Sequence, residues 1–273
     1  MTDDGGFRVI VANTTHTCRE ICQRQKATGD TARLLSELVT GAVLLRETLA
    51  PWLRTQAIAV GAERKGKLIA DAYPDGSNRG LKQLSDTENF HLGEGAVMQV
   101  MREAANGSTH EGVVEITSAG GINGALMNYM LQSEQIDCVI AVSGRINDAG
   151  IGQAGGYIVQ VLPEVTRELH MIMTERLGAF PNFSDILQDS EPWMMPLLGD
   201  ILYGMPFTLL EQSPLRFKCR CSQARVLASL ATLDRDTLRD LISVNDFLEI
   251  ECDYCGENYQ IFAEKLKSLL SEN

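Results

Sequence analysis

Two closely spaced pairs of cysteines near the end of the chain constrain its fold more than any other feature. Cys219 and Cys221 are separated by one residue. Cys252 and Cys255 follow after thirty intervening residues and are separated by two. Zn²⁺ prefers four such ligands in a tetrahedron, and a turn between the cysteines of C-x-x-C directs both sulfur atoms to one point. The spacing therefore predicts one zinc ion per chain, bound by all four thiolates, with no position open to a substrate.

The second pair lies in a predicted hairpin. Residues 247–251 and 259–262 have the alternating apolar pattern of strands, and they flank Cys252 and Cys255. Gly256 favours a turn directly after the pair. Each cysteine pair is thus expected to come from a different structural element.

A small C-terminal module surrounds both pairs. We expect short helices at residues 222–233, 236–242 and 263–270. So small a module has few large apolar side chains and a weak core. Zinc would supply much of its stability, on the order of 10 to 16 kcal/mol of apparent binding energy in comparable peptides. Loss of zinc is then expected to unfold this module while the first domain survives.

Four cysteines of this spacing are compatible with two roles. One is a purely structural zinc knuckle. The other is a redox switch, because the C-x-C thiolates are crowded and Lys218, Arg220 and Arg225 place positive charge near them. Such charge lowers the pKa of a thiol and keeps the sulfur nucleophilic. An oxidant would convert the thiolates to disulfides, and zinc and the fold that it held would be lost.

Composition excludes several other classes of protein. The formal net charge of -12 argues against nucleic-acid binding, which requires clustered Lys and Arg. No apolar run approaches the roughly 20 residues of a membrane span. The acidic start of the chain lacks the pattern of a signal peptide, and seven is an odd number of cysteines for a disulfide framework. We therefore expect a cytoplasmic protein.

The first 160 residues alternate between strand and helix patterns, which predicts an antiparallel-rich α+β domain. The expected elements are a strand at 7–12, helices at 15–25 and from 30 to before Pro51, a hairpin at 56–73, a helix at 94–105, a strand at 112–118, a helix at 122–135, and strands at 138–143 and 157–162.

A glycine-rich stretch at residues 150–155 formally matches the dinucleotide-binding pattern G-x-G-x-x-G. That pattern must open a helix, whereas residues 157–162 have the composition of a strand. We therefore interpret the glycines as a hairpin loop. The four histidines are isolated in sequence, and G-x-S-x-G and H-E-x-x-H are absent, so the sequence does not indicate an enzyme.

The three remaining cysteines are expected to be buried thiols of the core. Cys18 and Cys22 lie four apart on one face of a predicted helix, and Cys138 lies in an apolar strand.

Helical segments interrupted by proline and glycine begin at Pro163, which is expected to start a helix to residue 177. Methionine-rich surfaces of this kind suit partners of varied shape, although methionine also fills gaps in an ordinary helical layer. Five of the ten methionines lie here and are candidates for binding such partners: Met171, Met173, Met194, Met195 and Met205.

The chain resembles the redox-regulated 33 kDa heat-shock chaperone family of the bacterial cytosol, also called 33 kDa chaperonins. The motifs that carry the resemblance are FKCRCS at 217–222, IECDYCG at 250–256 followed by Tyr259, QSEQ at 132–135, AGG at 154–156 and QVLP at 160–163. The resemblance extends over nearly the whole chain.

The resemblance implies an ATP-independent holdase that binds unfolding proteins under oxidative stress. It implies that Cys219, Cys221, Cys252 and Cys255 bind zinc in the inactive, reduced form, and that oxidation pairs Cys219 with Cys221 and Cys252 with Cys255. It further implies an N-terminal core domain at residues 1–174, a metastable helical linker at 175–213, a zinc-binding redox-switch domain at 214–273, and a homodimer when oxidised. The alternative is a constitutive scaffold or small-ligand protein with a purely structural zinc knuckle.

Overall fold

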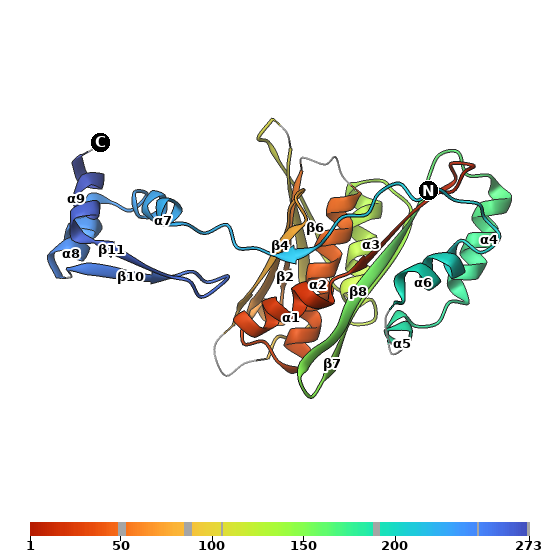
Figure 1. Cartoon of the computed structure of the whole chain (residues 1–273), viewed down its shortest axis with the longest axis horizontal. Coiled ribbons are helices and arrows are strands. Elements are labelled where there is room, and N and C mark those ends of the chain that lie inside the picture. Colours follow the sequence, from red (N-terminus) through yellow and green to blue (C-terminus); the bar gives the residue numbers. More distant parts are fainter. Residues whose placement is uncertain (49–52, 85–88, 105, 188–191, 245, 272–273) are drawn as a thin grey trace. The chain divides into compact units, whose positions relative to one another are not determined.

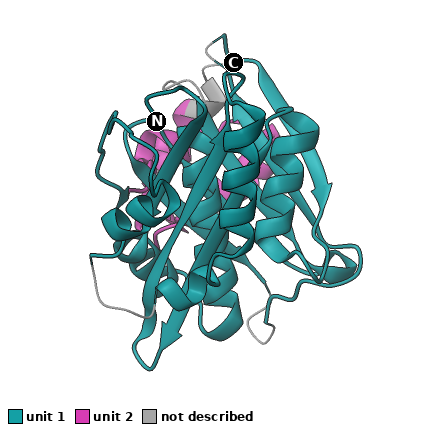
Figure 2. Cartoon of the chain, turned by 90° about the vertical axis from the view of Figure 1, so that its right-hand side faces the viewer, with its two compact units in different colours: residues 1–217 teal, residues 218–273 magenta. Residues whose placement is uncertain are grey.

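The computed structural model describes residues 1–48, 53–84, 89–104, 106–187, 192–244 and 246–271. The chain divides into two compact units, Met1–Phe217 and Lys218–Asn273 (Figure 2). Helices and antiparallel sheets occur together, so the predicted α+β class is confirmed. The end of the helix that was expected before Pro51 lies outside the described residues.

Two sheets form the frame of the first unit. The six-stranded sheet has the order β6-β5-β2-β3-β4-β9, and only the β4–β9 pair is parallel. Its strands are β2 (Arg54–Val60), β3 (Lys67–Ala72), β4 (Ser77–Gln83), β5 (Val97–Glu103), β6 (Thr109–Glu115) and β9 (Arg216–Phe217). The three-stranded antiparallel sheet has the order β1-β8-β7 and consists of β1 (Phe7–Asn13), β8 (Gly150–Val161) and β7 (Cys138–Asn147). A short 3₁₀ turn, η1 (Ala62–Arg64), lies within the β2–β3 connection, which confirms the predicted hairpin.

Three helices lie between these sheets: α1 (Thr15–Arg24), α2 (Gly29–Glu47) and α3 (Gly121–Ser133) (Figure 1). Helix α2 contacts both sheets, so it is buried almost all round rather than along one stripe. Its buried hydroxyls bond within the helix, where Ser36 Oγ donates to the Ala32 carbonyl and Thr40 Oγ1 to the Ser36 carbonyl, each at 2.8 Å. These bonds avoid the cost of an unpaired buried hydroxyl.

A second helical layer covers the other face of the three-stranded sheet. It contains α4 (Arg167–Gly178), α5 (Phe183–Ile186) and α6 (Met194–Ile201). Aromatic rings join the layer to the sheet, because Phe183 stacks edge-on against Tyr157 of β8 and against Trp193, with ring centroids 5.5 Å apart in both pairs. This layer has its own apolar core, separate from the one around α2.

The structure corrects the prediction of a helix at residues 94–105, because Val97–Glu103 form strand β5 and residue 105 lies outside the described residues. Methionine and glutamine in this segment favour helices intrinsically. Pairing with β2 and β6 overrides this preference and buries alternate residues, Met98 and Val100.

The glycines at 150–155 also differ from prediction, since they belong to strand β8 itself and not to a hairpin loop. Their small size admits close neighbours. A Cβ on Gly155 would lie 2.6 Å from the Trp193 ring, and one on Gly156 would lie 2.8 Å from the Val142 side chain. Helix α4 likewise begins later than expected, at Arg167 after the N-cap Thr166, and Pro163 precedes it.

The second unit contains α7 (Gln223–Leu230), α8 (Arg235–Val244), the antiparallel strands β10 (Phe247–Glu251) and β11 (Asn258–Phe262), and α9 (Ala263–Ser271). The predicted hairpin around the second cysteine pair and the three short helices are therefore confirmed.

Candidate metal centre

The two cysteine pairs occupy different kinds of backbone. Cys219 and Cys221 lie in the irregular segment that leads into α7, whose N-cap Ser222 accepts a hydrogen bond from the Arg225 amide at 3.3 Å. Cys252 and Cys255 lie in the turn between β10 and β11.

Backbone hydrogen bonds fix the turn that carries the second pair. The Cys255 amide donates to the Cys252 carbonyl at 3.1 Å, and the Gly256 amide donates to the same carbonyl at 2.8 Å. Gly256 has φ +73°, a conformation that side chains with a Cβ rarely adopt. The turn therefore folds the chain back and leaves both sulfur atoms on one side.

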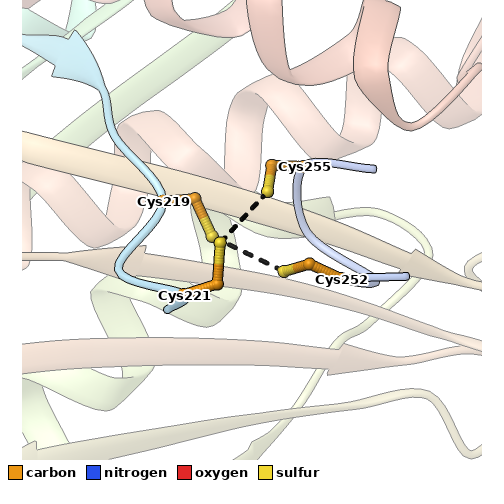
Figure 3. A group of neighbouring side chains, drawn as sticks. All are labelled: Cys219, Cys221, Cys252 and Cys255. Atoms are coloured by element: carbon orange, nitrogen blue, oxygen red, sulfur yellow. Dashed lines mark hydrogen bonds between the residues drawn. The ribbon is translucent and has the colours of Figure 1, made fainter. Parts of the chain in front are cut away.

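All four sulfur atoms converge on one point, lying within 4.8 Å of one another (Figure 3). Cys219 Sγ lies 3.7 Å from Cys252 Sγ, and Cys221 Sγ lies 3.4 Å from Cys255 Sγ. A tetrahedral Zn²⁺ with bonds of about 2.3 Å to sulfur needs sulfur atoms about 3.8 Å apart. The donor set and its spacing therefore fit zinc. Within the described residues, no other group of three or more His, Cys, Asp or Glu side chains has such an arrangement.

The unit that carries this centre has a small apolar core. Its buried side chains, within the described residues, are Leu238, Ile261 and Leu266. Helix α7, which follows the first cysteine pair, buries none of its side chains. A bound metal would therefore join elements that apolar packing holds together only weakly.

Burial and hydrogen bonding dominate the pKa values of the thiols. Burial raises the pKa of Cys252 and of Cys255. Burial also acts to raise the pKa of Cys219, but hydrogen bonds with Cys221 and the facing thiols outweigh it and lower that pKa. The sequence suggested that the positive charges of Lys218, Arg220 and Arg225 set the pKa values of these thiols. In the structure, burial and hydrogen bonds have the larger effect on those of Cys219, Cys252 and Cys255.

Tyr259 is a neighbour of the centre whose role sequence reasoning missed. Its hydroxyl donates a hydrogen bond to Cys221 Sγ at 3.1 Å, and this bond raises the pKa of the phenol. The sequence did contain a signal for this contact. Side chains alternate between the two faces of a strand, so Tyr259 lies on the face opposite to the exposed Gln260, on the strand next to the cysteine turn.

The other three cysteines are buried in the first unit, as predicted. Cys18 Sγ lies 3.8 Å from the Ser36 carbonyl oxygen, and Cys22 Sγ lies 3.7 Å from that of Ala32. Burial raises the pKa of Cys18 and of Cys138 to about 12 and that of Cys22 to about 11. These thiols stay protonated at neutral pH.

The five candidate methionines differ in exposure. Met173 and Met205 are buried in the core of the second helical layer, whereas Met171, Met194 and Met195 are exposed. Over the described part of the chain, no helix has the length and apolarity needed to span a membrane.

Comparison with known proteins gives a consistent result. Residues 1–262 match the family described as "Hsp33 protein". The chain is 28% identical to the 33 kDa chaperonin of Syntrophotalea carbinolica, covering 99% of this chain and 97% of that protein. It is 30% identical to the 33 kDa chaperonin of Trichormus variabilis, covering 98% of this chain and 93% of that protein.

A solved structure shares the fold. The crystal structure of the 33 kDa chaperonin of Thermotoga maritima has a TM-score of 0.82 to this chain at 22% sequence identity. The similarity covers 98% of this chain and 94% of that one.

Proposed function

This chain belongs to the Hsp33 family of redox-regulated chaperones, and from that premise we propose that it is an ATP-independent holdase switched on by oxidation of Cys219, Cys221, Cys252 and Cys255. It is a chaperone rather than an enzyme. The observation that carries the proposal is the convergence of four sulfur atoms from two separate segments within 4.8 Å. Their unit buries few apolar side chains, so its fold depends on what those sulfur atoms bind.

In the reduced state the four thiolates would hold one zinc ion. The bound metal ties the segment before α7 to the β10–β11 turn. Thiolate is both the metal ligand and the nucleophile toward oxidants, so one group serves binding and sensing.

Oxidation removes these ligands. For each disulfide, two thiols lose two electrons and two protons to one molecule of hydrogen peroxide, which becomes two molecules of water. A disulfide sulfur is no longer a thiolate, so the metal leaves and the unit loses the link between its segments. We propose the pairs Cys219 with Cys221 and Cys252 with Cys255, as the family resemblance implies.

The chaperone state then requires that an apolar surface becomes accessible. We propose that residues 175–213 are the linker that is released, between a core domain at 1–174 and the redox-switch domain at 214–273. The linker contains α5 and α6, whose apolar side chains pack on the three-stranded sheet. Separation of such a layer exposes apolar surface on both partners, and exposed apolar patches bind other chains.

The proposed clients are unfolded or partly folded proteins, which present apolar side chains of varied shape. Met173 and Met205 are hidden in the closed layer and would become accessible only on release. Met171, Met194 and Met195 are already exposed, so in the proposal they extend the client surface without controlling it. We further propose that the chain acts in the cytoplasm and forms a homodimer when oxidised.

The test is light scattering from a thermally unfolding client protein. The full chain is added either reduced and zinc-loaded or after treatment with hypochlorous acid, and zinc release is measured in the same samples. We expect suppression of scattering only after oxidation, together with zinc loss. Zinc loss without suppression would favour a purely structural zinc knuckle, and suppression in both samples would indicate a constitutive chaperone.

A further inference from the structure

The strand that follows the cysteine turn brings a tyrosine to the metal centre. Tyr259 pairs with Ile250 across the β10–β11 hairpin. Alternation along β11 leaves Gln260 and Phe262 exposed, while Tyr259 and Ile261 face the interior of the unit. This register directs the phenol toward Cys221, where its hydroxyl lies 3.1 Å from the sulfur atom.

A hydroxyl in this position can act on the sulfur in two ways. As a donor it stabilises the negative charge of a thiolate and fixes the direction of its lone pairs. It also withdraws electron density from the sulfur, which makes that thiolate a weaker nucleophile toward peroxide. Groups that hydrogen-bond to metal ligands commonly change metal affinity by about 10- to 100-fold.

We propose that Tyr259 is a positioning residue of the metal centre, whose hydroxyl orients the Cys221 thiolate, strengthens zinc binding and slows oxidation of that sulfur. The proposal rests on the proposed function, since it adds to the zinc site a residue that sets how readily oxidant opens it. Tyr259 thereby acts on Cys221 in particular, because its hydroxyl donates to that sulfur atom.

A neighbouring contact supplies a matched control. Gln223 Nε2 donates to the Gln260 carbonyl at 3.3 Å, and Lys265 Nζ donates to Gln223 Oε1 at 3.0 Å. Gln223 thus also ties the segment after Cys221 to β11, but through atoms other than sulfur. A variant at Gln223 weakens the same junction without removing the hydrogen bond to the thiolate.

The experiment compares Tyr259→Phe, Gln223→Ala and the unaltered full chain, all reduced. Zinc affinity is measured by competition with a chelator, and the rate of zinc release is measured after addition of hydrogen peroxide. The sulfur-to-metal charge-transfer band of the cobalt(II) form reports the electron density on the thiolates. Phenylalanine keeps the ring, and binding of cobalt(II) in a tetrahedral site confirms that each variant folds.

For Tyr259→Phe we expect roughly tenfold weaker zinc affinity, faster zinc release by peroxide, and a charge-transfer band at lower energy. Gln223→Ala should leave the band unchanged. Unaltered zinc affinity and an unaltered band in Tyr259→Phe would overturn the proposal, as would an equal band shift in Gln223→Ala.

These readouts need no client protein, so they separate this inference from the proposed function. If the unaltered chain failed to suppress aggregation while Tyr259→Phe shifted the band, the holdase function would fail and the role of Tyr259 would stand. If oxidation activated both proteins equally and the band did not move, the role of Tyr259 alone would fail.

Discussion

The seven cysteines of this chain occupy two different environments. Four are half-buried and converge in the C-terminal unit, where their sulfur atoms contact one another. Cys18, Cys22 and Cys138 are buried among apolar side chains of the first unit, and burial raises the pKa of each thiol. Because reagents reach a half-buried thiol far more readily than one buried in an apolar core, the two groups should differ strongly in reactivity.

Alkylation of the folded protein tests this difference between residues. With a zinc chelator and iodoacetamide at neutral pH, we expect modification of Cys219, Cys221, Cys252 and Cys255 and protection of the three buried thiols. Their pKa values of about 11 to 12 should preserve this protection up to about pH 9. Peptide mass spectrometry locates the modified sites, and in a denatured sample all seven cysteines should be modified. Modification of Cys18 in the folded protein would contradict the prediction.

At the scale of elements, strand β8 is the surface on which two layers meet. Gly155 and Gly156 leave room on opposite faces of the strand, because a Cβ at Gly155 would clash with Trp193 and one at Gly156 would approach the Thr40 side chain of α2. Trp193 directly precedes α6 and is buried against Phe183. The Trp193 ring is therefore one of the buried contacts that hold the second helical layer on the sheet.

Trp193→Ala should loosen that layer in the reduced protein. A large-to-small change at a buried aromatic costs about 3 to 5 kcal/mol, because the cavity that remains is only partly refilled. We expect a lower free energy of unfolding in urea, together with increased binding of a dye specific for apolar surface.

Met195→Ala is the matched control for this change, because Met195 lies in α6, which begins directly after Trp193, and is 53% exposed. Its free energy of unfolding should stay within about 0.5 kcal/mol of the original. Equal stability and equal dye binding for the two variants would show that Trp193 does not hold the layer.

At the scale of the whole molecule, the two units are stabilised differently. The first has two apolar cores built around α2 and around the second helical layer. The second has three buried apolar side chains within its described residues and a four-sulfur centre. In a small unit of this kind, metal binding supplies the part of the folding free energy that apolar burial does not.

Removal of zinc from the reduced protein should therefore unfold one unit only. We expect amide hydrogens of β10 and β11 to lose protection from exchange on addition of a chelator, while those of β2 and β3 keep theirs. Hydrogen exchange followed by mass spectrometry measures both in one sample, and re-addition of zinc is the control for reversibility. Retained protection in β10 after metal removal would show that the second unit folds without metal.

The sequence by itself determined the metal centre and much of its setting. Cysteine spacing predicted a four-thiolate cluster, alternation predicted the β10–β11 hairpin, and apolar neighbours predicted the buried Cys138. These features depend on a few residues that are close in sequence, so local patterns are sufficient to predict them.

Only the tertiary structure decided the rest. Strand β5 forms because β2 and β6 supply hydrogen-bonding partners on both sides, which outweighs the helical preference of its residues. The glycines of β8 belong to a strand because β1 and β7 pair with β8 along its two edges. Tyr259 reaches Cys221, 38 residues earlier, because the hairpin register directs its ring there. Each of these outcomes depends on contacts between residues far apart in the chain, which local patterns do not encode.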